Sequence, residues 1–329
     1  MDTSTAKKGP GKAFRRGMSL ADLFRLFPDD ATAEAWFAEQ RWGGKPTCPQ
    51  CGHDDVQTGC AHRTMPYRCR HRECRKRFSV KVGTIMESSN LDYQTWAIAI
   101  YLHTTSLKGV SSMKLHRDLG ITQKSAWHLA HRIRAAYGEP GDLFEGPVEA
   151  DEAYFGGKQK NKHIGDREYI GRGAVGKTIV AGVKDRETNC ISAAVVESTK
   201  KRELQSFVAQ RASVAADHFT DELASYKGLP NHTAVRHSIG EYVRGQAHIN
   251  GMESFWAAMK RGYYGVYHRM SPKHLDRYVA EFSGRHNLRR ANTIDQMRTL
   301  VRRMLGQRLR YPDLIEPNGR PSGAREMAL

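Results

Sequence analysis

The segment from residue 248 to residue 262 reads HINGMESFWAAMKRG and constrains the fold more than any other part of the chain. On a helix its large apolar residues form one stripe that needs a core to pack against; they are Met252, Phe255, Trp256 and Met259. Glu253 and Lys260 fall almost in line two turns apart, and Asn250 shares the side of Glu253. We therefore expect a helix that buries one face and presents an acid beside positive charge on the other.

Two acids upstream stand in contexts that suit the same site. Asp151 lies in a strand-like alternation at 148–155, and Asp221 ends the short apolar run 218–221. Asp221 follows Asp151 by 70 residues and Glu253 follows Asp221 by 32, so the three acids meet only through the fold. Carboxylates that hold two Mg²⁺ ions about 4 Å apart activate water or a 3′-hydroxyl against a phosphodiester.

The charge of the chain indicates a polyanionic partner. Among 329 residues, 52 Lys and Arg face 35 Asp and Glu, a formal charge of +17. Such an excess favours nucleic acid or an anionic membrane surface. Between residues 244 and 310, 14 Lys or Arg accompany four acids, with aromatic residues interleaved. This mixture suits DNA backbone contacts and base stacking, and the alternative interpretation is a solvated helical face.

The sequence contains no run of about 18 apolar residues, so we expect no membrane-spanning helix. The polar, basic N-terminus lacks the apolar core of a secretory signal, so we expect a cytoplasmic protein. Clustered cysteines in that compartment bind metal more often than they form disulfides.

Four cysteines have the spacing of a zinc ribbon. Cys48 and Cys51 form a CPQC knuckle, and Cys69 and Cys74 form a looser pair among short strand-like runs. We expect these four thiolates to hold a structural Zn²⁺ in a tetrahedron. Four residues separate the second pair where two are usual, so the remaining candidates for one ligand are Cys60, His62 and His71.

The next segment predicts helices at 91–104, 111–119 and 122–134, with Thr122 as N-cap of the third. Two short helices around Gly120 match a helix-turn-helix, and a small packing bundle is the alternative. In the helix-turn-helix interpretation, the residues that face DNA are Gln123, Lys124, Ser125 and His128.

From residue 147 onward the pattern becomes mixed α/β. Strands are predicted at 148–155, 178–184, 190–197, 217–220 and 233–236, with helices at 201–212 and 252–261. The order β-β-β-α-β-α-β-α is that of a ribonuclease-H-like domain. In that fold the first and fourth strands bring two acids together and a later helix adds a third, the places of Asp151, Asp221 and Glu253. The segment 171–178 matches a P-loop by letter, but the strand-like residues after it argue against an ATP site.

At these residues the chain resembles the zinc-ribbon DDE insertion-sequence transposases of the ISXO-like branch. The resemblance covers most of residues 18–290 and rests on motifs in one order; they lie at 48–51, 78–84, 111–118, 149–158, 248–256, 260–262, 278–282 and 285–287. It implies a DNA transposase that binds the terminal inverted repeats of its own element, cuts the DNA ends and joins them to a target.

The resemblance also implies the roles of individual residues. Asp151 and Asp221 match the first two metal-binding acids of a site with two Mg²⁺ ions, for which Mn²⁺ substitutes. The third role belongs to Asn250 or Glu253, and we favour Glu253 because a carboxylate binds Mg²⁺ better than an amide. Lys260 matches the downstream basic position. The residues expected to hold phosphates are Lys158, Lys260 and Arg261.

The implied partner is double-stranded DNA, both inverted repeats and target. Because two ends must be brought together, we expect a homodimer or higher oligomer on DNA, at the bacterial nucleoid. Two other functions stay open: a DNA-binding regulator with an inactive nuclease domain, and a ribonuclease-H-like nuclease without strand transfer.

The expected domain order follows from these segments. It is a disordered basic tail (1–17), a helical segment (18–45), a zinc ribbon (46–88), a helix-turn-helix-like domain (89–140), the catalytic domain (145–290), and a basic helix with a disordered tail (291–329).

Overall fold

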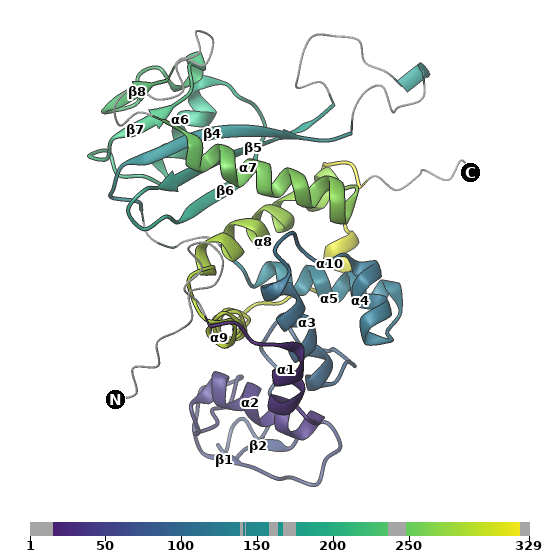
Figure 1. Cartoon of the computed structure of the whole chain (residues 1–329). Helices are drawn as coiled ribbons and strands as arrows, with labels where there is room; N and C mark the ends of the chain where they lie inside the picture. Colours follow the sequence, from purple (N-terminus) through teal and green to yellow (C-terminus); the bar gives the residue numbers. More distant parts are fainter. Residues whose placement is uncertain are drawn as a thin grey trace. The chain divides into compact units, whose positions relative to one another are not determined.

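The computed structural model describes residues 16–138, 141, 143–157, 164–166, 176–235 and 248–322. The chain divides into two compact units. Figure 1 colours the chain along its sequence and labels the helices and strands. The first contains Met1–Tyr137 and Leu288–Glu316, and the second contains Gly138–Asn287 and Pro317–Leu329. Residues 1–15 of the predicted N-terminal tail and residues 323–329 of the predicted C-terminal segment lie outside the described residues.

The first unit is mainly helical. Its helices are α1 (Leu20–Leu26), α2 (Asp30–Trp42), α3 (Tyr93–Thr105), α4 (Ser112–Leu119), α5 (Gln123–Ala135), α9 (Thr293–Arg303) and α10 (Tyr311–Ile315). Side-chain oxygens of Asp29, Asp92, Ser111 and Thr122 accept a backbone N–H of the first turn of α2 to α5. These caps satisfy donors that have no partner inside the helix, so the predicted Thr122 cap is confirmed.

The main apolar core of this unit joins its N-terminal helices to its C-terminal segment. Trp96 and Ile100 of α3 are fully buried with Phe37 of α2. Leu300 and Val301 of α9 enter the same core. The C-terminal segment 288–316 therefore completes the first unit, a connection that local sequence patterns do not reveal.

A small antiparallel sheet carries the cysteine region of the first unit. Its strands are β1 (Val56–Gln57), β2 (Tyr67–Cys69) and β3 (Arg77–Phe78), in that order. Trp42 packs edge-on against Tyr67, with ring centroids 5.0 Å apart, and Tyr67 stacks on Phe78 at 5.6 Å. These rings supply a core for strands too short to hold together by themselves.

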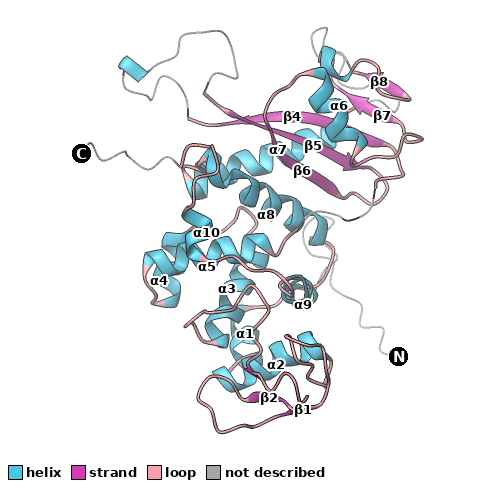
Figure 2. Ribbon diagram, turned by 180° about the vertical axis from the view of Figure 1, so that it is seen from behind, coloured by secondary structure: helices cyan, strands magenta, loops and turns pink. Residues whose placement is uncertain are grey.

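The second unit is a mixed five-stranded sheet with helices on both faces (Figures 1 and 2). Its strands are β4 (Val148–Phe155), β5 (Thr178–Asp185), β6 (Ile191–Val196), β7 (His218–Thr220) and β8 (His232–Ala234). The order is β6-β5-β4-β7-β8; β4, β5 and β6 pair antiparallel, while β7 pairs parallel with both β4 and β8. The predicted mixed α/β class is confirmed, and the sheet is consistent with a ribonuclease-H-like domain.

Three helices cover this sheet: α6 (Lys201–Ala209), α7 (Asn250–Gly262) and α8 (Leu275–Leu288). On β4 the residues alternate between faces. Val148 and Ala150 pack with α6, whereas Ala153 and Phe155 pack with α7 and α8. Short helical turns lie at Ile164–Asp166, Ala224–Tyr226, Tyr263–Tyr267 and Pro272–His274. Within the described ranges, no helix combines the length and apolar character that crossing a membrane requires.

The helix expected between the fourth and fifth strands of the catalytic domain was a wrong prediction. Residues 221–231 contain only the single 3₁₀ turn η3 (Ala224–Tyr226). Gly228 takes a positive φ of 98°, and Pro230 follows two residues later. Because these residues interrupt a short segment, no second helical turn forms there.

Gly182 of β5 lets α7 approach the sheet. Gly182 pairs with Asp151 across the ladder. A Cβ atom on Gly182 would lie 2.9 Å from Cζ2 of Trp256 and would also collide with the methyl group of Met252. The apolar stripe of α7 therefore sits directly on bare backbone.

We predict that Gly182→Ala destabilises the fold by about 1–3 kcal/mol, because the indole of Trp256 must move away from the sheet. Denaturant unfolding measures this loss. Gly265→Ala is the matched control, since no described neighbour lies within 4 Å of its Cβ position. Equal stability of the two variants would contradict the close contact.

Candidate active site

Asp151 lies on β4, and Asp221 directly follows the neighbouring strand β7. In the parallel pair β4 and β7, Val148 is opposite His218 and Glu149 is opposite Phe219. The same offset carried two residues further puts Asp151 level with Asp221, and paired strands are about 4.8 Å apart. Asp221 directly follows β7, and its Oδ1 accepts the backbone N–H of Leu223 at 3.0 Å. The register thus brings two carboxylates together where β7 ends.

The environment of Asp151 disfavours a negative charge. Its side chain is buried, and its pKa is raised well above the ordinary value, first by burial and then by the charges of Glu152 and Asp221. The indole Nε1 of Trp256 donates a hydrogen bond of 3.0 Å to its Oδ2. A divalent cation among these carboxylates would offset their repulsion, so the donor set fits such an ion.

Glu152 is a third acid near this pair, and sequence reasoning missed it. Burial and the charge of Asp221 raise the pKa of Glu152 to about 7. The hydroxyl of the buried Tyr226 donates to its Oε2 at 3.0 Å. Adjacent strand residues point to opposite faces, so alternation alone separates Glu152 from Asp151. The available signal was the unbroken acidic pair itself in the motif at 149–158.

A buried carboxylate on β4 holds the start of α7. Oε2 of Glu149 accepts the backbone N–H of Met252 at 3.0 Å, and its Oε1 accepts Nε of Arg186 at 2.9 Å. Met252 lies in the first turn of α7, where backbone donors lack helical partners. A Cβ on Gly251 would lie 2.7 Å from Glu149 Oε2. Glu149 therefore caps the helix from a neighbouring strand, and glycine leaves it room.

The polar residues predicted on α7 point away from its apolar stripe. Asn250, Glu253, Lys260 and Arg261 are all exposed. Among the described residues, only the cysteines discussed below bring three or more possible metal ligands within 4.8 Å of one another. The ligand atoms of Glu253, Asp151 and Asp221 therefore do not all lie within 4.8 Å of one another. The choice of Glu253 rather than Asn250 as the third metal ligand stays a prediction. Lys158 lies outside the described residues.

The four cysteines of the predicted ribbon converge in the first unit. All four Sγ atoms lie within 4.8 Å of one another; they belong to Cys48, Cys51, Cys69 and Cys74. Sγ of Cys48 is 3.7 Å from that of Cys74, and Sγ of Cys51 is 3.6 Å from that of Cys69. A tetrahedron with metal–sulfur bonds of about 2.3 Å has edges of about 3.8 Å, so the cluster fits a metal ion. The wide second pair closes without the three alternative ligands.

The predicted DNA-facing side of α5 contacts the C-terminal segment of its own unit. Nζ of Lys124 lies 4.3 Å from the ring centroid of Tyr311. Nε2 of His128 donates to the carbonyl of Leu309 at 3.0 Å. Gln123 Nε2 donates to Ser112 Oγ at 3.3 Å, which ties α5 to α4. The role of Lys124 and His128 in binding DNA stays a prediction, and any DNA there would meet residues 309–311 as well.

Comparison with known proteins agrees with this geometry. Residues 144–287 match the model of the ISXO2-like transposase domain. Residues 144–287 therefore carry a transposase domain of this type. A similar protein, described as an uncharacterized protein in transposable element ISH50 of Halobacterium salinarum, is 25% identical over 291 residues, which cover 84% of this chain and 97% of that protein.

The predicted resemblance to the ISXO-like transposases is thereby confirmed. A transposase domain of this type implies DNA as a partner and the use of divalent metal. The matched residues contain Asp151, Asp221 and Glu253, together with the anchoring carboxylate Glu149.

We predict that His128 makes the first unit of this protein sensitive to acid. Burial lowers the pKa of His128 below 6.5. The folded chain then binds a proton less readily than the unfolded chain, so the free energy of unfolding falls as the pH drops through about 6.5. In His128→Gln, whose amide can donate to Leu309, urea unfolding from about pH 8 to 5 should show a smaller decrease.

His218 and His232 also have pKa values lowered by burial, and their contribution remains in both proteins. An identical pH dependence for the wild type and His128→Gln would contradict the prediction.

Proposed function

We propose that this protein is a DNA transposase that binds the terminal inverted repeats of an insertion sequence and catalyses metal-dependent strand cleavage and strand transfer. The observation that carries the proposal is the pairing of β4 with β7, which aligns Asp151 with Asp221 inside a transposase-family domain. Such a protein acts on DNA in the cytoplasm, at the nucleoid.

These acids and one residue of α7 are the proposed metal ligands. Asp151, Asp221 and Glu253, or Asn250 in place of Glu253, would hold two Mg²⁺ ions, for which Mn²⁺ substitutes. When bound, these ions lower the pKa of water and neutralise charge on the phosphate. Trp256 fixes the orientation of Asp151 through its 3.0 Å hydrogen bond.

The reaction needs no nucleotide cofactor. Water attacks the phosphodiester at the element end and frees a 3′-hydroxyl, which then attacks a phosphodiester of target DNA. The second step exchanges one ester for another, so the number of phosphodiester bonds is conserved. The exposed cations Lys260 and Arg261, with Lys158, would hold phosphates on either side of the reacting group.

The first unit is the proposed end-binding part. Cys48, Cys51, Cys69 and Cys74 would hold a structural Zn²⁺ that stabilises a ribbon at 46–88. The pair α4 and α5, within the helix-turn-helix-like domain at 89–140, would bind the inverted repeat beside it. The catalytic domain spans 145–290. Because two ends react together, we propose a dimer or higher oligomer on DNA.

We predict that Asp151→Asn removes metal-dependent cleavage of labelled DNA that carries the element ends, and leaves end binding nearly unchanged. Asparagine keeps an oxygen that can accept from Trp256 and removes a repelling charge, so the variant should be no less stable than the wild type. Mn²⁺ should raise the melting temperature of the wild type more than that of the variant.

The matched control is Asp217→Asn, an exposed acid at the opposite end of β7 that should cut normally. Specific end binding without cutting by the wild type would favour a regulator with an inactive nuclease domain. Cutting without joining to a target plasmid would favour a nuclease without strand transfer. Normal cutting by Asp151→Asn would refute the assignment of this residue.

We predict that Cys69→Ser loses the bound Zn²⁺ and that β1 to β3 then unfold. Zinc binding in small sites supplies roughly 10–16 kcal/mol, which a three-stranded sheet this short cannot replace. Metal analysis should find one zinc in the wild type and none in the variant, and hydrogen exchange should rise in residues 46–78.

Cys60→Ser is the control, since Cys60 is not part of the thiol cluster and should keep the metal. Loss of zinc in Cys60→Ser, or its retention in Cys69→Ser, would show that the ligand set is wrong.

A further inference from the structure

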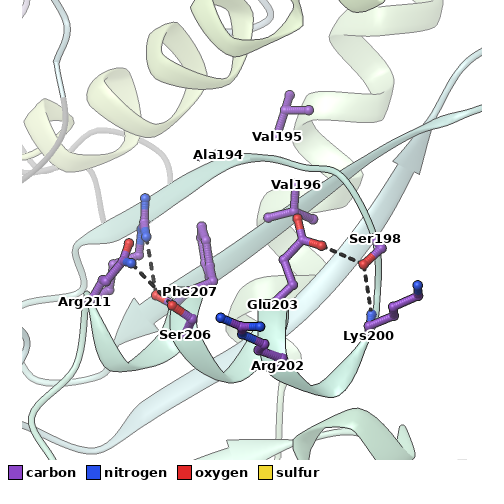
Figure 3. Close-up of a pocket in the computed structure, with 11 residues that line it drawn as sticks. Ala194, Val195, Val196, Ser198, Lys200, Arg202, Glu203, Ser206, Phe207 and Arg211 are labelled. Atoms are coloured by element: carbon purple, nitrogen blue, oxygen red, sulfur yellow. Dashed lines mark hydrogen bonds between the residues drawn. The ribbon is translucent and has the colours of Figure 1, made fainter.

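A groove lies between the edge strand β6 and helix α6 in the second unit (Figure 3). It encloses about 540 Å³. Residues from the end of β6, from the following turn and from one side of α6 line it; they include Val196, Ser198, Lys200, Arg202, Gln210 and Arg211. None of the predicted site residues belongs to it.

The groove has a surplus of positive charge. Lys200, Arg202 and Arg211 line it together with one acid, Glu203. Oε1 of Glu203 accepts the backbone N–H of Glu197, and Oε2 accepts the hydroxyl of Ser198, each at 2.5 Å. This carboxylate is therefore turned toward the strand-to-helix connection, as Figure 3 shows for its bond to Ser198. The three cations therefore give the groove a net positive charge.

Arg211 is held in place by its neighbours. Its Nε donates to Oγ of Ser192 at 2.9 Å, and its guanidinium lies 3.8 Å from the ring centroid of Phe207. A planar guanidinium fixed in this way is suited to phosphate, because little side-chain entropy is lost on binding. Lys200 and Arg202 are exposed at the other end of the groove, where they can follow a flexible backbone.

One end of the groove lies close to the acids of the candidate active site. The hydroxyl of Ser225 donates to the carbonyl of Thr199, the residue before Lys200, at 2.5 Å. The next residue, Tyr226, donates to Glu152 at 3.0 Å. Two hydrogen bonds and two steps along the chain thus connect Lys200 with Glu152, the neighbour of Asp151 on β4.

We propose that this groove binds the phosphodiester backbone of the DNA that flanks the cleavage site. The inference rests on the proposed function, and it adds a binding surface that the catalytic motifs do not contain. α6 has nine residues and is therefore about 13 Å long, the rise of about four base pairs of B-DNA. The cations would contact sugar-phosphate and carry no sequence information.

The test is the affinity of the full-length protein for two fluorescent duplexes, one with the element end and one of random sequence, over a series of salt concentrations. Lys200→Gln combined with Arg202→Gln should weaken binding to both duplexes by a similar factor, on the order of 10- to 100-fold near 0.1 M salt. The slope of log affinity against log salt should fall by about two, since each lost phosphate contact removes about 0.9.

The control is Arg25→Gln combined with Lys45→Gln, which changes the net charge equally. Both cations are exposed and lie outside the segments proposed to bind DNA, and both are paired with acids, Arg25 with Asp22 at 2.8 Å and Lys45 with Asp54. The control should keep the wild-type slope. An unchanged slope in the groove variant, or an equal loss in the control, would overturn the proposal.

A second measurement locates the DNA. A photo-crosslinking residue at Gln210 should label the element-end duplex within about four base pairs of the cut position, and the same residue at the exposed Arg25 should not. Labelling spread evenly along the duplex would refute the proposed path. If the wild type cuts no DNA, the proposed function fails, while the salt slope still tests the groove separately.

Discussion

The arrangement of the candidate active site depends on two hydrogen bonds that fasten α7 to β4. Glu149 accepts the backbone N–H of Met252, and two residues later Asp151 accepts the indole N–H of Trp256. Two strand residues rise by about 6.6 Å and four helical residues by about 6 Å, so both bonds form without distorting either element. Gly182 and Gly251 clear the space for this contact. Because the apolar stripe of α7 is buried, its polar side faces solvent. Asn250 and Glu253 are therefore exposed at the N-terminus of α7, which Glu149 caps.

The same contact concentrates negative charge where the fold tolerates it least. Asp151 is buried beside Glu152 and within the field of Asp221, and each carboxylate raises the cost of ionising the next. A structure selected for stability alone would not place three acids so close together. A divalent cation bound between these carboxylates would explain the arrangement, because its attraction for each carboxylate would offset their repulsion. The two proposed metal sites therefore differ. The four thiols already lie at distances that suit a tetrahedral metal ion. The acids would need a cation to offset their mutual repulsion.

Local patterns in the sequence predict much of this structure, and long-range contacts account for what they miss. The period of 3.6 in the segment that became α7, the alternation along β4 and the hydroxyl of Thr122 before α5 are all local signals, and those elements form as predicted. The cap from Glu149 to Met252 spans 103 residues, so no window of sequence contains it. Strand alternation did not indicate Glu152, because it assigns Asp151 and Glu152 to opposite faces of β4. It also takes no account of Asp221, which follows the neighbouring strand β7. Leu309 and Tyr311 cover α5 from nearly 200 residues away, and only the fold shows that the C-terminal segment belongs to the first unit.

The free edge of the sheet explains why the groove beside it suits a polyanion better than a peptide strand. β6 ends the sheet, and an unpaired edge normally offers backbone groups to another strand. Here side chains of α8 occupy those groups. Asn287 accepts the N–H of Ile191 at 2.8 Å and donates to its carbonyl at 2.9 Å, and Asp276 accepts the N–H of Val195 at 3.0 Å. An added strand would have to displace both side chains. What remains accessible between β6 and α6 is a set of cationic and polar side chains, and such groups recognise phosphate oxygens rather than a peptide backbone.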